Sequence, residues 1–122
     1  MQDHTKLMVW RKARALSVLV HQLAGAMRPG SVPGLRAQLI RSTLSIATNV
    51  AEGASRHTRM DFARFVSMAI ASSSETEHHL TVCVDLGIMS REAAATAIER
   101  TVEVRRMLCG LQRALNQASK KS

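Results

Sequence analysis

Titratable side chains that could form a metal site lie near the middle of the chain. Glu75 and His78 form a Glu-x-x-His pattern, which places both side chains one turn apart on a helix. Di-iron bundles use this pattern twice, together with glutamates from two further helices, but it occurs once here. Glu75 and His79 are also one turn apart, and a pair on a helix surface accounts for them. The sequence therefore predicts no metal site and no cofactor.

Other residues that could take part in catalysis or ligand binding are scattered along the chain. The segment Gly25–Ser31 superficially resembles a phosphate-binding loop, but it lacks the lysine, and Pro29 removes a backbone N–H. No Gly-x-Ser-x-Gly motif surrounds a serine. His4, His21 and His57 fit solvated residues or modest anion contacts better than a catalytic base. We therefore expect no catalytic residue and no enzyme activity, and a metal-dependent enzyme is the least favoured class.

Cys83 and Cys109 are isolated and match no Cys-x-x-Cys pattern. Each falls on or beside the apolar face of a predicted helix, which indicates reduced core thiols rather than a disulfide or a metal pair. No apolar run reaches the roughly 18 residues of a membrane span, and the N-terminus lacks the layout of a signal peptide. These features predict a cytoplasmic protein with no membrane partner.

The net charge is the most informative number. The chain carries 17 Lys and Arg against 9 Asp and Glu, a net charge of +8, and residues 1–64 alone hold ten basic and three acidic residues. The planar guanidinium of arginine suits phosphate contacts, so this located field favours RNA or DNA backbone as a partner over basic residues scattered on a bundle surface. The predicted nucleic-acid-binding residues are Arg11, Lys12, Arg14, Arg36, Arg41, Arg56, Arg59 and Arg64.

Aromatic residues are rare: Trp10, Phe62 and Phe65 make up 2% of the chain. This scarcity excludes modules that stack bases on aromatic platforms, such as RNA-recognition sheets and OB-folds, and it disfavours a β-sandwich or barrel. Apolar residues make up 46%, which is enough for one core in a chain of 122 residues. We therefore expect a single all-α domain.

Apolar residues three and four positions apart predict four helices in a domain of residues 1–118, at about 4–27, 35–52, 58–86 and 91–118. Residues 28–34 are predicted to form a loop, and residues 119–122 a frayed basic tail. Short loops between long helices favour an antiparallel, up-down-up-down four-helix bundle. The predicted helix caps and stops are Asp3 or Thr5, Gly53, Thr58, Gly87 and Ser90.

The second predicted helix carries two apolar stripes, so we expect it to contact more than one neighbour. One stripe holds Leu35, Leu39, Thr43, Ile46 and Val50, and the other holds Ile40, Leu44, Ala47 and Ala51. The centre of the third helix consists of small residues, which bury little apolar area. A bundle this thin is expected to gain stability by forming a homo-oligomer.

Three segments resemble a known family over about residues 7–115. Leu7–Ala13 is similar to its opening Leu-x-Val-Trp-x-Lys-Ala motif, and Gln38–Gly53 to its main signature, which ends in Asn-Ile-Ala-Glu-Gly. Phe62–Glu77 resembles its third-helix pattern, although Ala71 replaces a usual glycine and Ile40 a usual arginine. The family is that of the four-helix-bundle proteins called 23S rRNA-intervening sequence proteins. Its wider group includes the accessory variability proteins of bacterial diversity-generating retroelements.

The resemblance implies an antiparallel four-helix bundle that assembles into a ring-like homopentamer without catalysis. Its retroelement branch further implies a basic surface for nucleic acid and a reverse transcriptase as partner. The motifs also imply structural or interface roles, with Asn49 and Glu52 facing Ser72 and Glu75 across the second and third helices. The residues concerned are Trp10, Asn49, Glu52, Gly53, Ser72 and Glu75.

The sequence thus predicts a non-enzymatic, oligomeric bundle that presents a basic surface to the RNA or DNA backbone and could assist a reverse transcriptase. The alternative is a protein–protein scaffold whose charge serves an acidic partner. Both functions fit the charge of +8.

Overall fold

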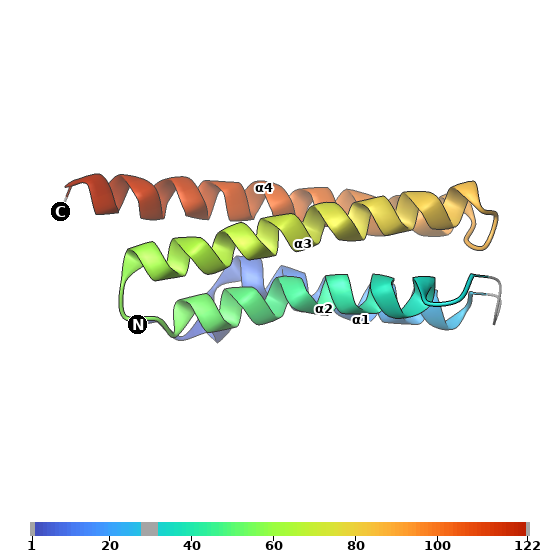
Figure 1. The fold of residues 1–122 in the computed structure, drawn as a ribbon, viewed down its shortest axis with the longest axis horizontal. Coiled ribbons are helices and arrows are strands. Elements are labelled where there is room, and N and C mark those ends of the chain that lie inside the picture. The colour runs from blue at the N-terminus through green and yellow to red at the C-terminus, as the bar shows by residue number, and fades with distance from the viewer. Residues whose placement is uncertain (1, 28–31, 122) are drawn as a thin grey trace.

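Four long helices lie side by side (Figure 1). The computed structural model describes residues 2–27 and 32–121, with side chains up to residue 117. A short 3-10 helix, η1 (His4–Lys6), precedes the four α-helices, and the described residues contain no strand, so the all-α class is confirmed. The helices are α1 (Met8–Gly25), α2 (Leu35–Ala54), α3 (Arg59–Asp85) and α4 (Arg91–Lys121).

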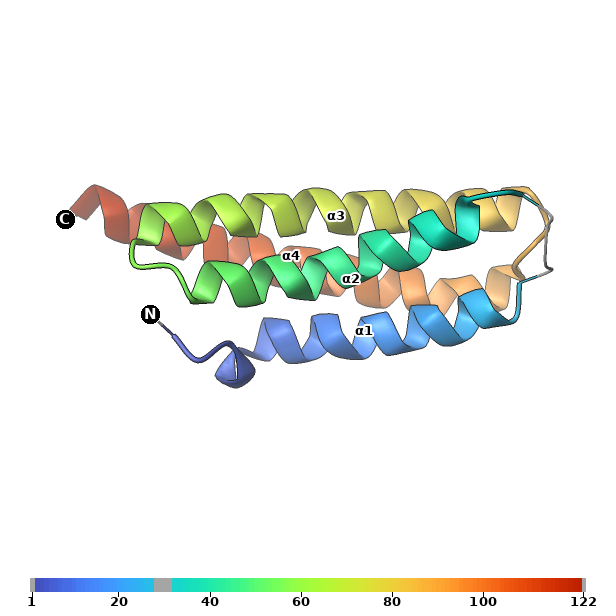
Figure 2. The same ribbon diagram turned by 60° about the horizontal axis from the view of Figure 1, so that its bottom comes forward.

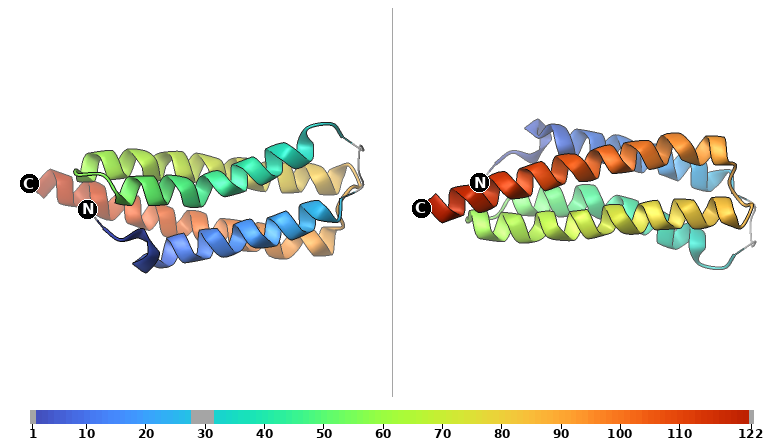
Figure 3. Two further views of the ribbon diagram at one scale, coloured as in Figure 1. Left: turned by 90° about the horizontal axis from the view of Figure 1, so that it is seen from below. Right: turned by 90° about the horizontal axis from the view of Figure 1, so that it is seen from above.

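The chain reverses direction from one helix to the next. Between α2 and α3, Ser42 Oγ lies 2.9 Å from Thr76 Oγ1, and Ser45 Oγ lies 2.9 Å from Ser72 Oγ. A step forward along α2 therefore corresponds to a step backward along α3. The colour gradient reverses in the same way at every helix pair joined in sequence (Figure 2), and α1 contacts α4 to close the bundle (Figure 3).

One core runs along the bundle axis, and the apolar faces of all four helices contribute to it. The first stripe of α2 is buried, and α1, α3 and α4 each bury apolar residues spaced three and four apart. This burial removes the apolar faces of the helices from water, which is the main term that stabilises such a bundle. The largest fully buried apolar side chains are Leu16, Leu39, Ile46, Leu80 and Leu108.

The first helix begins later than the sequence predicts. Asp3 accepts hydrogen bonds from the Thr5 backbone N–H at 3.0 Å and from the Thr5 hydroxyl at 2.6 Å, which caps η1 and lowers the pKa of the Asp3 carboxyl. Leu7 then adopts extended backbone angles, and α1 starts at Met8 without a side-chain cap. The Asp3 capping interaction therefore belongs to η1, and the helix predicted over 4–27 is divided in two.

Gly53 does not end α2, contrary to the prediction. The helix continues to Ala54, and Gly53 is buried inside it. A methyl group on Gly53 would lie 2.8 Å from Phe62 Cδ1 and 2.9 Å from Phe65 Cβ, so the glycine is required for close packing rather than for helix termination.

The predicted start and end of α3 and the predicted start of α4 agree with the structure. Thr58 Oγ1 accepts a hydrogen bond from the Asp61 N–H at 3.1 Å, and Ser90 Oγ accepts one from the Ala93 N–H at 3.1 Å. Gly87 follows α3 with a φ of 72°, in a left-handed turn closed by hydrogen bonds to the last carbonyls of the helix. The α4 backbone continues to Lys121 instead of ending at 118, and Ser122 of the predicted tail lies outside the described residues.

The helix α2 contacts both α1 and α3, which confirms the prediction that it has more than one neighbour. Its second apolar stripe is only partly covered within one chain. Ile40 and Ala47 pack against the core, Ala51 is half-buried, and Leu44 is 53% exposed. Of the predicted loop 28–34, residues 28–31 lie outside the described part of the chain, and Val32, Pro33 and Gly34 are exposed.

Candidate nucleic-acid interface

Five of the eight predicted arginines and lysines gather at one end of the bundle. Arg11 and Arg14 lie in the first two turns of α1, Arg56 lies in the turn after α2, and Arg59 and Arg64 lie in the first two turns of α3. The backbone N–H of Gln2 donates to the carbonyl of Ala54 at 2.9 Å, which joins the start of the chain to the α2–α3 turn. We call this end, which carries the N-terminus in Figure 1, the basic end.

The side chains of the basic end are exposed and mostly free of acidic partners. The Arg56 guanidinium lies 4.5 Å from the centroid of the Phe65 ring, a cation–π contact that leaves its charge uncompensated. Arg64 lies 3.3 Å from Asp61 in a pair whose side chains are 66% and 45% exposed, which screens the interaction. Arg59 makes no ion pair within the described residues.

Arg11 and Arg14 lie beside the single tryptophan. The Arg11 Nε donates to the carbonyl of Thr5 at 2.8 Å, and the Arg14 guanidinium lies 5.4 Å from the centroid of the Trp10 ring. The His4 ring meets Trp10 edge to face at 4.8 Å. These contacts orient both arginines before any ligand binds.

Three predicted residues do not join the basic end. Arg36, at the start of α2, donates from Nη2 to the carbonyl of Met27 at 2.8 Å, which assigns it to the α1–α2 connection. Arg41 is exposed on the second apolar stripe of α2. Lys12 Nζ lies 2.9 Å from Glu103 on α4, so part of its charge is already compensated.

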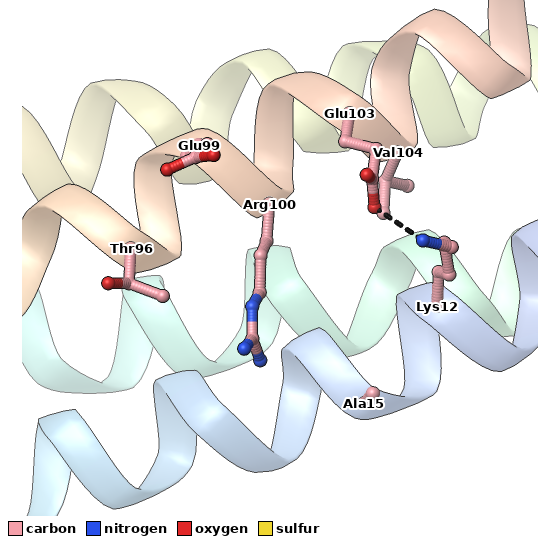
Figure 4. Close-up of a pocket in the computed structure, with 7 residues that line it drawn as sticks. All are labelled: Lys12, Ala15, Thr96, Glu99, Arg100, Glu103 and Val104. Atoms are coloured by element: carbon pink, nitrogen blue, oxygen red, sulfur yellow. Dashed lines mark hydrogen bonds and ion pairs between the residues drawn. The ribbon is translucent and has the colours of Figure 1, made fainter.

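The Lys12–Glu103 pair borders a pocket of about 430 Å³ between α1 and α4. Figure 4 shows Arg100 extending from α4 toward α1 across this pocket, with Glu99 and Thr96 on the same helix. Acidic and basic groups alternate here, so the net field is weak. This pocket is a less favourable place for a polyanion than the basic end.

Arginines of α4 were not selected from the sequence. Gln112 on α4 donates to Ser67 Oγ on α3, so Arg113, the next residue, lies near the beginning of α3. Arg113 and Arg106 are exposed and seven residues apart, a spacing that places them on one helix face. This spacing could have identified Arg106 and Arg113 from the sequence. They were passed over because basic and acidic residues are nearly equal in number after residue 64.

The family motif on α2 and α3 forms a polar seam. Asn49 Nδ2 donates to the Ser45 carbonyl at 2.8 Å and to Ser45 Oγ at 2.9 Å, and Ser45 in turn contacts Ser72 on α3. Asn49 therefore reaches α3 through Ser45 and is half-buried rather than buried. Glu52 is exposed, and no hydrogen bond or ion pair joins its side chain to α3 within the described residues.

Glu75 pairs within α3 and not across to α2. Its Oε2 lies 3.2 Å from Nε2 of the buried His79, which is the one-turn helix pair considered from the sequence. The described residues hold no group of three or more histidine, cysteine or acidic side chains that could bind a metal ion.

Both cysteines are free; Cys83 is buried, and burial raises the pKa of its thiol. No helix in the described part of the chain is long and apolar enough to cross a membrane.

The fold and these side chains define a class: a strongly basic, all-α four-helix bundle protein. Residues 5–110 match the family described as 23S rRNA-intervening sequence protein, and the chain belongs to this family. The structure is similar to the crystal structure of a protein of unknown function from the S23 ribosomal protein family of Bacteroides thetaiotaomicron. The TM-score is 0.81 at 22% sequence identity, over 86% of this chain and 98% of that chain. No curated protein matches the chain.

Proposed function

We propose that this protein is a non-enzymatic homo-oligomer that binds the RNA or DNA backbone through its basic end. The observation that carries the proposal is the gathering of Arg11, Arg14, Arg56, Arg59 and Arg64 at one end of a chain with a net charge of +8. Four of these five form no ion pair in the described residues, although Arg11 interacts with the charge of Asp3 at longer range. Guanidinium groups free of carboxylates are available to phosphates.

The family name supports nucleic acid as the polyanion, because it links these proteins to intervening sequences of 23S rRNA. The resemblance to retroelement accessory proteins extends the proposal to a reverse transcriptase as protein partner. That partner would be recruited to a nucleic acid already held at the basic end.

Self-association is the second part of the proposal. The second stripe of α2 borders an apolar surface pocket of about 640 Å³, lined by Ala37, Ile40, Arg41, Leu44, Ser45 and Thr48. Covering this stripe with another copy of the chain would remove it from water. A closed ring, such as the pentamer that the resemblance implies, would repeat the basic end and raise affinity through avidity. Light scattering tests this, and a mass equal to one chain contradicts it.

The salt dependence of binding tests the electrostatic mechanism. Five phosphate contacts give a slope of log affinity against log salt near −4.5, so raising salt from ~50 to ~200 mM weakens duplex binding about 500-fold. Fluorescence anisotropy of a labelled duplex measures this slope. An affinity that is flat over the same range rejects the proposal.

A pair of variants locates the contacts. Arg56→Gln with Arg59→Gln removes two charges from the basic end, so we expect the salt slope to fall by about two for every sequence tested. Arg91→Gln with Arg100→Gln removes two exposed charges from the first part of α4 and serves as the control. Equal losses from both pairs contradict a located interface. A pull-down that survives nuclease points instead to an acidic protein partner.

A further inference from the structure

A surface pocket beside the single tryptophan has a volume of about 520 Å³ and is lined by Thr5, Trp10, Arg11, Arg14, Ala15 and Val18. We propose that this Trp10 pocket binds one unpaired base of a single-stranded nucleic acid, with the adjoining phosphate held by Arg11. This inference rests on the proposed function. It adds a defined subsite and a preference for single strands over duplex.

One side of the pocket offers a surface for stacking. The Arg14 guanidinium lies over the Trp10 ring at 5.4 Å from its centroid, so the tryptophan supports the guanidinium, whose outer face forms a wall for a base. Bases stack both on aromatic rings and on arginine planes, whatever their sequence. Val18, 55% exposed, and the exposed Ala15 add an apolar edge for the sugar and the base.

The other side offers a phosphate contact. Arg11 uses Nε to hold the Thr5 carbonyl at 2.8 Å, which fixes the guanidinium and leaves its two terminal amino groups for a phosphate. Asp3 accepts its hydrogen bonds from Thr5 and forms no ion pair with Arg11, although the two charges interact at longer range. A base stacked at Arg14 and Trp10 therefore has the Arg11 cation next to it for the phosphate.

This arrangement selects single strands for a geometric reason. Bases inside a duplex are paired and stacked, so they can enter a side pocket only after extrusion from the helix. The arginines at the α2–α3 turn would contact only the phosphates of the nucleic acid, so they would bind single strands and duplexes alike. The scarcity of aromatic residues excludes a platform for several bases, but one tryptophan suffices for one base.

The chain contains one tryptophan, so its fluorescence reports on this pocket alone. Short oligothymidylate, short oligouridylate and a duplex of equal phosphate count would be titrated against the full chain. We expect saturable quenching by both single strands and none by the duplex. A difference between oligothymidylate and oligouridylate distinguishes a DNA from an RNA ligand.

Variants connect the signal to affinity. Trp10→Leu should weaken single-strand binding about tenfold, as measured by anisotropy of a labelled strand, and leave duplex binding unchanged. Trp10→Phe retains an aromatic ring and should recover part of the loss. If Trp10→Leu does not fold by circular dichroism, Arg14→Gln tests the same wall from the exposed surface. Arg91→Gln, at the start of α4, removes an equal charge as a control.

The outcomes separate the two proposals. If strands and duplex both bind but Trp10 fluorescence stays constant, Trp10→Phe binds like the unaltered chain and Arg14→Gln weakens both forms equally, the Trp10 pocket is rejected and the basic end remains. If quenching accompanies a selective loss of single-strand affinity, the Trp10 pocket is supported. If neither form of nucleic acid binds by anisotropy, both proposals fail.

Discussion

Different side chains join the helices on two sides of the bundle. Small residues and hydroxyl groups join α2 to α3, whereas long charged side chains lie between α1 and α4. The α2–α3 side is closed by Gly53 against Phe62 and by hydroxyl pairs, of which Ser42 and Thr76 are buried. The α1–α4 side is spanned by an exposed ion pair and leaves a pocket of about 430 Å³. Small residues permit close helix approach, whereas long charged side chains keep the helices apart.

This difference in packing suggests that the α2–α3 side contributes mainly to stability and the start of α1 mainly to binding. Close packing at Gly53 leaves no room for a methyl group, and every buried side-chain polar atom in the described residues has a hydrogen-bond partner. The start of α1 keeps Arg11 and Arg14 exposed, while Trp10 is half-buried, with part of its ring packed against the core. We therefore expect changes on the α2–α3 side to alter unfolding and changes near the start of α1 to alter binding.

The largest expected difference is in thiol reactivity. Cys83 on α3 is fully buried with a raised pKa, while Cys109 on α4 is half-buried. Reaction requires an accessible thiolate, so Cys83 should react only after local opening, at least ~100-fold more slowly than Cys109. Mass spectrometry after timed alkylation measures both rates. A Cys109→Ser variant should retain only the slow phase, and equal rates would show that α3 opens as readily as α4.

The next effect is on packing. Gly53→Ala forces a methyl group against Phe62 and Phe65, so the free energy of unfolding should fall by about 1–2 kcal/mol. Gly110→Ala on α4 is the control, because its nearest neighbour atom would be the flexible end of Arg113 at 3.9 Å. That change should raise stability by about 0.5–1 kcal/mol, since alanine favours a helix. Urea unfolding measures both, and effects of the same sign contradict the comparison.

A smaller effect follows from removing one buried hydroxyl. Thr76 is fully buried, and Oγ1 lies 2.9 Å from both Ser42 Oγ and the Ser72 carbonyl. Thr76→Val should lower the free energy of unfolding by about 1 kcal/mol, because a buried hydrogen bond is lost. Thr81→Val removes an exposed hydroxyl from the same helix and should change little. Equal effects in urea unfolding would mean that the polar seam contributes nothing beyond the helix itself.

The smallest effect is expected for the ion pair across α1 and α4. Its side chains are 42% and 51% exposed, so Lys12→Gln should change the free energy of unfolding by no more than about 0.5 kcal/mol. A double-mutant cycle with Glu103→Gln isolates the pairwise interaction, which should decrease further in high salt. A coupling above ~1 kcal/mol would show that this side is as firmly joined as α2–α3.

The helices and their main seams could be predicted because they depend on local spacing. Apolar residues three and four apart, together with caps such as Thr58 and Ser90, decide where a helix forms and which face it buries. Prediction from the sequence was wrong where side chains of another helix decide the role of a residue. Gly53 has the local signature of a helix stop, but Phe62 and Phe65 use it as a packing surface.

The sequence identified candidate residues of the site, but it did not show which of them lie together on one surface. Arg11 and Arg59 could be selected by type and by the charge of the first half of the chain. Neither sequence position nor spacing shows that Arg36 is engaged by the Met27 carbonyl or Lys12 by Glu103. The position of Arg113 relative to α3 likewise depends on the α3–α4 contact between Gln112 and Ser67.

The sequence by itself determined the all-α class, the four helices and the sign and rough location of the charge, because periodicity and composition act within a helix or over the whole chain. The tertiary structure decided which arginines meet at the basic end, which are neutralised and which lie beside Trp10. It also decided that the second stripe of α2 is only partly covered, with Leu44 exposed. These outcomes depend on the way the helices align, and that alignment is set by contacts between residues far apart in the chain.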